Sequence, residues 1–179
     1  RTAVYFKRPL GVQSAALASL CPAVTVECGR AIDRAGIDHA AEFVEAALAM
    51  SHFPEHPVPE HDLDLMQTRA IIKVPPEARI SFDGTDADFM FPATLDHLNF
   101  SELDPGTSFG KLGTAQTARL DIQPGGETNE TTAYFDYRDG EIRLIRSAIP
   151  AMLTLDPKAI RLDCLGYLMH RIGRDGALL

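Results

Sequence analysis

The sequence predicts an α+β protein in which an incomplete α/β piece, residues 1–60, precedes a β-rich domain, residues 61–179. Three observations support this prediction. A short apolar run lies between two segments with helical spacing near the start of the chain, which is typical of an α/β layer. A segment with three prolines, residues 51–62, cannot continue a helix and is expected to be a linker. Beyond it, the runs become short and rich in β-branched and aromatic residues.

In the first region, the order of elements is expected to be helix, strand, helix. The segment GVQSAALASLCP has the Ala and Leu spacing of a helix that ends near Cys21. The run Ala23–Val26 predicts a strand buried on both faces, as inside a parallel sheet. Asp38 is the expected N-cap of a second helix. This helix would carry an apolar stripe, with Glu42 and Glu45 off it; the stripe comprises Ala40, Phe43, Val44, Ala47, Leu48 and Met50.

The second region contains short strand-like runs separated by glycine turns. Such spacing predicts a small antiparallel sandwich or barrel. The hairpin signal is clearest in YFDYRDGEIRLIR, with the turn at Arg138, Asp139 and Gly140. The expected strands are TRAIIKV, ARISF, ADFMF, TARLDI, TTAYFDY and EIRLIRS.

The end of the chain is expected to be different. The segment DCLGYLMHRIG predicts a short helix that packs Leu165, Leu168 and Met169 against the β-rich domain.

Composition excludes some classes of function. A net charge of −8 argues against nucleic acid as the main partner, because phosphate binding needs clustered Lys and Arg. No apolar run is long enough to span a bilayer, and the opening RTAVYFKRPL lacks the charged-then-apolar order of a signal peptide. Three cysteines without a Cys-x-x-Cys pair suit a reducing compartment, so a cytoplasmic location is expected.

Glu27 is the residue that raises a functional question. A carboxylate at the end of a buried strand is costly unless it is paired, hydrogen-bonded or bound to metal. In open parallel sheets, sites form at the carboxyl ends of strands, where Glu27 is expected to lie. Two interpretations remain open on position alone. Glu27 is either a site residue or a structural carboxylate that caps the next helix or pairs with Arg30 or Arg34.

The motif PAVTVECG, followed by a spacer and an amphipathic helix, resembles the closing part of the zinc-binding domain of the succinylglutamate desuccinylase/aspartoacylase family, in the zinc carboxypeptidase superfamily. That family has a hydrophobic-Glu-hydrophobic-Gly pattern, which here is Val26-Glu27-Cys28-Gly29. The region from Gln67 onward is similar to the family's C-terminal β-domain. There, FPATLDHLNFSELDPGTSFGKLG resembles a stretch in which a proline-glycine turn precedes a strand. The resemblance implies that Glu27 is a catalytic general base.

The sequence departs from that family in its metal ligands. The family holds zinc with a His-x-x-Glu pair and a further His upstream of the catalytic glutamate, but the residues before Glu27 contain no histidine. The strings His39-Ala-Ala-Glu42 and His52-Phe-Pro-Glu55 do not have the family's placement. A linker cluster of His52, His56 and His61 is a weaker candidate for metal capture. No metal ligand is therefore assigned in this chain.

The resemblance implies the C-terminal portion of a longer zinc-dependent hydrolase, inactive alone, whose N-terminal half supplies the zinc ligands. Its substrate would be a small N-acylated molecule cleaved at an amide or ester bond. Apolar surface is expected to be exposed where the N-terminal half would pack, and a homo-oligomer that covers this surface is compatible with the sequence.

Two other classes of function are considered. One is a non-catalytic binding or regulatory β-domain module, in which Glu27 is structural. The other is a self-contained enzyme of another class. This last class is disfavoured because the sequence shows no recognisable Ser-His-Asp or Cys-His pattern, and because no base that could activate Cys28 is identified.

Overall fold

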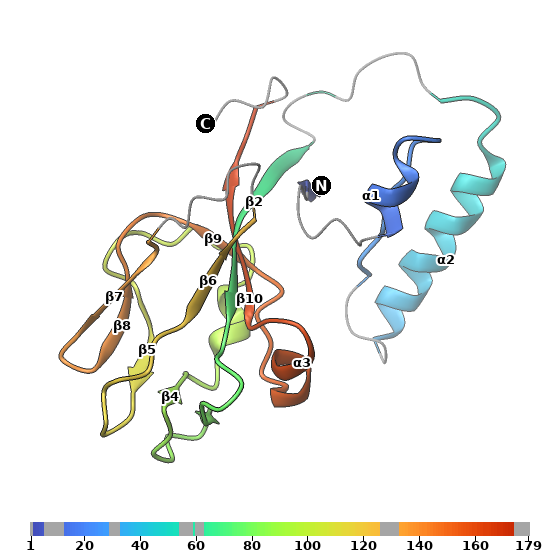
Figure 1. Cartoon of the computed structure of the whole chain (residues 1–179). Helices are drawn as coiled ribbons and strands as arrows, with labels where there is room; N and C mark the ends of the chain where they lie inside the picture. The colour runs from blue at the N-terminus through green and yellow to red at the C-terminus, as the bar shows by residue number, and fades with distance from the viewer. Residues whose placement is uncertain are drawn as a thin grey trace. The chain divides into compact units, whose positions relative to one another are not determined.

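The computed structural model describes residues 2–5, 13–28, 33–53, 59, 63–125 and 133–173. The chain divides into two compact units (Figure 1). Unit 1 comprises residues 1–9 and 64–179, and unit 2 comprises residues 10–63. Unit 1 thus includes a strand from the start of the chain, β1 (Thr2–Tyr5), which pairs in parallel with β2 (Asp64–Lys73).

Unit 2 contains two helices, α1 (Gln13–Leu17) and α2 (Arg34–Ala49). Helices were expected in both places, but the prediction that Asp38 caps the second one was wrong. Asp33 is the N-cap, and its side chain accepts a hydrogen bond from the backbone N–H of Ala35 at 3.1 Å. Asp33 meets the free N–H groups of the first turn one turn earlier than Asp38 could. Asp38 lies inside the helix and forms an ion pair with Arg34 at 3.1 Å.

The strand expected at Ala23–Val26 is not formed. Residues 22–28 have no regular secondary structure, and Val24 is 72% exposed. A strand is stabilised by hydrogen bonds to a neighbouring strand, and the described part of unit 2 contains no strand that could supply them. The apolar composition of Ala23–Val26 predicted burial, but none of these four residues is buried.

Unit 1 is β-rich, as expected, and is built from two five-stranded sheets. In the first sheet, β2 is the long strand to which three others pair. The first sheet has the order β1-β2-β10-β9, with β6 paired to the second half of β2; its further strands are β6 (Asp121–Pro124), β9 (Ile149–Ala151) and β10 (Gly166–Arg171). The second sheet has the order β3-β4-β5-β8-β7, with strands β3 (Ile80–Ser81), β4 (Phe89–Met90), β5 (Ser108–Leu112), β7 (Phe135–Arg138) and β8 (Glu141–Leu144).

The predicted hairpin is confirmed. Strands β7 and β8 pair antiparallel, with Phe135 opposite Leu144 and Arg138 opposite Glu141. The two turn residues, Asp139 and Gly140, have φ angles of 52° and 74°. Two successive positive φ angles are typical of the tight turn that matches strand twist, which explains the Asp-Gly sequence.

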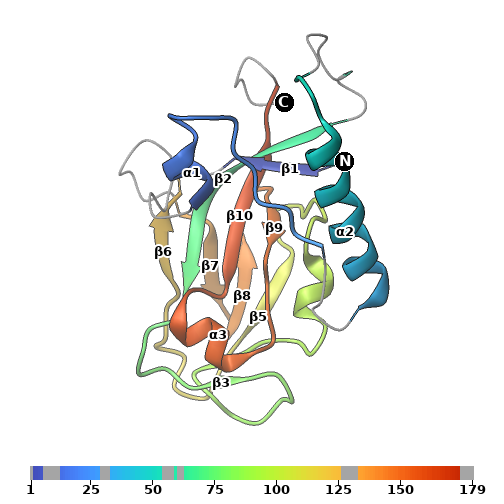
Figure 2. The same cartoon turned by 90° about the vertical axis from the view of Figure 1, so that its right-hand side faces the viewer.

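The helix expected at the end of the chain was wrong, because DCLGYLMHRIG contains strand β10. This strand lies between β2 and β9 in the first sheet (Figure 2). A strand in the middle of a sheet is buried on both faces and reads as a continuous apolar run, which periodicity cannot distinguish from a buried helix. The residues expected to be in the core, Leu165, Leu168 and Met169, are fully buried. The helix in this region is α3 (Pro157–Leu162), which Asp156 caps.

The two sheets share one core. From the first sheet, Ile72 and Leu168 contribute to it, and from the second sheet Phe89, Phe109 and Ile142 do so; all are fully buried. Phe109 is at the centre of an aromatic group, with its ring centroid 5.1 Å from Phe135 and 6.4 Å from Phe91. Unit 1 therefore has its own hydrophobic core.

Asp83 stabilises the turn between β3 and β4 through hydrogen bonds, and these bonds make the stability of the protein depend on pH. Its Oδ1 accepts hydrogen bonds from the backbone N–H of Thr85 at 3.0 Å and from the Ser81 hydroxyl at 2.8 Å. These donors, the Thr85 backbone first, lower the pKa of Asp83 from 3.8 to about 2. A carboxyl whose pKa is lower in the folded state stabilises the protein above its unfolded pKa, and this contribution is lost as the pH falls through the folded value.

We therefore expect Asp83→Ala to lower the melting temperature at pH 7 and to reduce the loss of stability between about pH 4 and pH 2. Asp83→Asn is the matched control, because it keeps an acceptor but carries no charge. Melting temperatures of the three proteins across this pH range test the prediction. Parallel curves for the wild type and the Ala variant would show that the turn carboxylate is not what titrates.

Candidate functional site

Glu27, the predicted general base, lies near the end of the extended segment 22–28 and is exposed. Within the described residues, its carboxylate has no hydrogen bond or ion pair. Its neighbours Gly29 and Arg30 lie outside the described residues. The side chain is therefore positioned by an extended backbone and is not held by another side chain that the structure describes.

Two of the structural roles considered for Glu27 are taken by other residues. The N-cap of α2 is Asp33, so Glu27 does not cap that helix. Arg34 donates to Asp38, one turn along the same helix, with its Nε 3.3 Å from Oδ2. Pairing with Arg30 falls outside the described residues. Among the described residues, the carboxylate of Glu27 therefore has no assigned structural partner.

The helix that follows Glu27 has an uncovered apolar face. The stripe that the sequence predicts is present on α2, but no residue of this helix is buried. Leu48 is 82% exposed, and Ile37 and Val44 are each about half exposed. An apolar face of this kind on a helix normally packs against another element. The extended run before Glu27 is uncovered in the same way.

The described histidines do not form a metal site. His39 and Glu42 lie on α2 and are exposed, and His52 Nδ1 is 3.0 Å from the Ser51 hydroxyl. Among the described residues, no group of three or more His, Cys, Asp or Glu side chains could hold a metal ion. Glu55, His56 and His61 lie outside those residues, as does most of the predicted linker.

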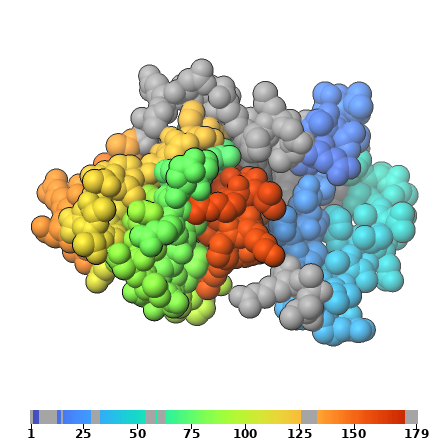
Figure 3. All heavy atoms as spheres, turned by 60° about the horizontal axis from the view of Figure 1, so that its bottom comes forward, coloured from blue at the N-terminus to red at the C-terminus, as the bar shows by residue number. Residues whose placement is uncertain are grey.

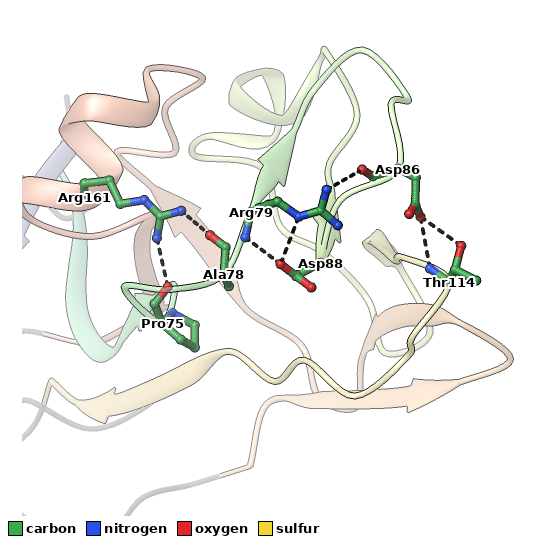
Figure 4. A network of polar contacts seen from close by, with 7 residues as sticks. All are labelled: Pro75, Ala78, Arg79, Asp86, Asp88, Thr114 and Arg161. Atoms are coloured by element: carbon green, nitrogen blue, oxygen red, sulfur yellow. Dashed lines mark hydrogen bonds and ion pairs between the residues drawn. The ribbon is translucent and has the colours of Figure 1, made fainter.

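Figure 4 shows a network of polar contacts in unit 1. Four of its residues, Arg79, Asp86, Asp88 and Thr114, line a cavity of about 280 Å³. Arg79 lies at its edge, where its backbone N–H donates to Asp88 Oδ2 at 2.7 Å and its guanidinium lies 3.7 Å from the same oxygen. Asp86 Oδ1 accepts two hydrogen bonds from Thr114, one from the backbone N–H at 3.0 Å and one from the hydroxyl at 3.1 Å. No sequence motif identifies these residues, although the acidic string DGTDAD contains both aspartates.

This cavity is best explained as structural. Both aspartates already accept hydrogen bonds, and a side chain at Gly113 would collide with the backbone oxygen of Ala87 at 2.0 Å. Arg161 of α3 donates in the same manner to the backbone oxygens of Pro75 and Ala78 (Figure 4). In Figure 3, the red segment that contains α3 accordingly lies against the green segment that contains these residues. These hydrogen bonds connect loops of unit 1. The residues that form them provide neither an activated nucleophile nor a group of free ligands for a metal ion.

No protein-family model, curated protein or solved structure matches this chain. Within the described residues, no helix has the length and apolar character needed to cross a membrane. A function must therefore be assigned from the chemistry and packing of the residues themselves.

Proposed function

We propose that this chain is the C-terminal part of a zinc-dependent hydrolase that resembles the succinylglutamate desuccinylase/aspartoacylase family. It would cleave the amide or ester bond of a small N-acylated substrate in the cytoplasm, with Glu27 as general base. The observation that carries the proposal is the exposed carboxylate of Glu27, which has no partner among the described residues and lies between an unpaired apolar segment and an uncovered apolar helix.

The packing of unit 2 supports the proposal that further chain completes it. Strands of α/β proteins are buried on both faces, and their helices cover those faces. Here the apolar run before Glu27 is unpaired, and α2 buries no residue. An N-terminal half that supplied neighbouring strands would cover both surfaces. It would also place Glu27 at the carboxyl end of a sheet strand, where such sites form.

The described residues offer no ligand set for zinc, so the metal would be held by that other half. In hydrolases of this kind, zinc polarises the scissile carbonyl and activates water. The contribution of this chain is proton transfer. Glu27 would accept a proton from the attacking water and deliver it to the leaving nitrogen of an amide or the leaving oxygen of an ester, which requires a free carboxylate within hydrogen-bond reach. Hydrolase activity of the intact gene product, with Glu27 and with Glu27→Gln, tests the assignment.

The first prediction from this proposal concerns metal. Equilibrated with zinc and then washed, the chain is expected to retain much less than one ion per molecule, because tight zinc sites need three or four converging ligands. Elemental analysis of the washed protein measures this. Stoichiometric zinc that disappeared in the triple variant His52→Gln, His56→Gln, His61→Gln would instead place a site in the linker.

A second candidate function is a non-catalytic binding or regulatory module. The observation in its favour is that unit 1 has a complete core of its own, shared by two sheets. The upstream gene sequence separates the two candidates. A His-x-x-Glu pair and a further histidine in it favour the hydrolase, whereas their absence favours the module.

A further inference from the structure

Two arginines of unit 1 differ from all the other arginines that the structure describes. Seven of the nine described arginines form a hydrogen bond or an ion pair with a carboxylate or a backbone oxygen: Arg34, Arg79, Arg119, Arg138, Arg143, Arg161 and Arg171. Arg69 and Arg146 have neither within the described part of the chain. In a chain of net charge −8, two guanidinium groups with no carboxylate partner among the described residues need an explanation.

Both arginines act on the same pair of side chains. Arg146 follows β8, and its guanidinium carbon lies 5.4 Å from the centre of the Tyr134 ring. The Tyr134 hydroxyl is 3.4 Å from His170 Nε2 on β10. Burial raises the pKa of Tyr134 and lowers the pKa of His170, and the charges of Arg69 and Arg146 lower the pKa of both groups.

Arg69 lies at an irregularity in the pairing of two strands. In the pairing of β2 with β10, Ala70 is opposite Leu168 and Thr68 is opposite Met169, so Arg69 between them has no partner. This is a β-bulge, a device that often redirects a side chain beside a functional site. It changes which side chains face the core, and it brings Gln67 opposite His170.

The second arginine–tyrosine contact in unit 1 shows what a structural pair looks like. Arg119 lies 4.5 Å from the Tyr137 ring centre, and its Nη1 donates to the backbone oxygens of Gln116 and Ala118. The Tyr137 hydroxyl accepts a hydrogen bond from the backbone N–H of Leu120 at 3.0 Å. The donors of Arg119 are thus used within the fold. Those of Arg146 are not, in the described residues.

We propose that Arg69, Arg146, Tyr134 and His170 form a binding site for a small oxyanion, a carboxylate or a phosphate. Guanidinium groups recognise both anions through charged hydrogen bonds, and the Tyr134 hydroxyl and a protonated His170 add two donors. Glu102, whose charge raises the pKa of His170, already pairs with Arg171 at 2.5 Å, as Asp64 does at 2.9 Å. The site is therefore positive and not neutralised from within the described chain. It does not depend on the hydrolase proposal.

His170 provides a direct readout of occupancy. Burial first, and then the charges of Arg69 and Arg146, lower the pKa of His170, and Glu102 opposes this effect. A bound anion would stabilise the protonated imidazole, so it should raise the pKa of His170. By linkage, affinity for the anion should increase as the pH falls through that pKa.

The experiment is a titration of the full chain with sodium phosphate and, separately, with sodium succinate. Sodium chloride keeps the ionic strength constant in both titrations. The ring signals of His170, assigned with His170→Gln, report its pKa by NMR. We expect saturable shifts and a higher pKa with at least one anion. The anion that binds more tightly shows whether the natural ligand carries a phosphate or a carboxylate group. Arg69→Gln with Arg146→Gln should lose about tenfold or more in affinity, as expected for charged hydrogen bonds.

Arg119→Gln is the matched control, because it removes an arginine stacked on a tyrosine in the same unit, and it should keep full affinity. If the double variant does not fold, Arg146→Gln alone serves, since that residue is exposed. The proposal is overturned if neither anion gives a saturable change. It is equally overturned if both arginine variants bind as tightly as the wild type.

Discussion

In the proposed intact zinc hydrolase, Glu27→Gln is expected to lower kcat at least about a hundredfold while folding and zinc content stay nearly unchanged. Glutamine keeps the size and hydrogen-bonding reach of the side chain but cannot accept the proton of water. General-base catalysis contributes roughly 10² to 10⁴ in rate. The loss should fall mainly on kcat, because proton transfer belongs to the transition state and not to substrate binding.

Stability is expected to be unaffected because Glu27 is exposed and makes no contact with a charged side chain among the described residues. Substitutions at such positions usually change the free energy of unfolding by less than about 0.5 kcal/mol. Melting temperature, zinc content and kcat should be measured on one preparation. Glu42→Gln is a suitable control, since Glu42 is an exposed glutamate of α2, and it should keep full activity.

The alternatives give different results in the same assay. If Glu27 pairs with a structural partner, the Gln variant would have a lower melting temperature, and activity would fall only as folded protein was lost. A stable, zinc-loaded and fully active variant would contradict both the catalytic and the structural role.

Phe109→Ala is expected to destabilise unit 1 by about 3–5 kcal/mol. Phe109 is fully buried between the two sheets and packs against Phe91 and Phe135. Removing the ring loses its burial and leaves a cavity that the surrounding strands cannot fill. Against a typical total stability of about 5–15 kcal/mol, this loss is a large fraction of the free energy of unfolding.

Urea unfolding of the wild type and the variant measures this difference, with Phe109→Leu as an intermediate case in which part of the apolar volume is kept. Ile145→Ala is the exposed control at the end of β8, where Ile145 is 46% exposed, and it should cost far less. An equal effect of Phe109→Ala and Ile145→Ala would mean that the shared core does not hold the two sheets together.

Local chemistry determined much of unit 1. The hairpin between β7 and β8 could be predicted because Asp139 and Gly140 tolerate positive φ angles that few residue types adopt. The strand-rich character of the region from residue 64 onward followed from β-branched and aromatic runs between glycine turns. The identity of buried residues such as Leu168 and Met169 was also correct, since burial depends mainly on apolar character.

The candidate site was only partly accessible from the sequence. The pattern Val26-Glu27-Cys28-Gly29 drew attention to Glu27, but its expected setting, a buried strand end, requires neighbours that the described unit 2 does not contain. The pair of Tyr134 and His170 was missed altogether. These two residues are 36 positions apart, and the arginines near them come from two further strands or loops.

Tertiary structure alone decided whether an apolar run became a helix or a strand. DCLGYLMHRIG has no period that separates the two states, and it forms β10 because β2 and β9 supply hydrogen bonds on both of its edges. Ala23–Val26 is unpaired because the described residues of unit 2 include no strand that could supply such hydrogen bonds. A turn is determined by the backbone preferences of a few adjacent residues and is legible in the sequence. A strand is stable only through hydrogen bonds to a partner strand, and the partner cannot be read from the sequence when it is distant, as β2 is from β10.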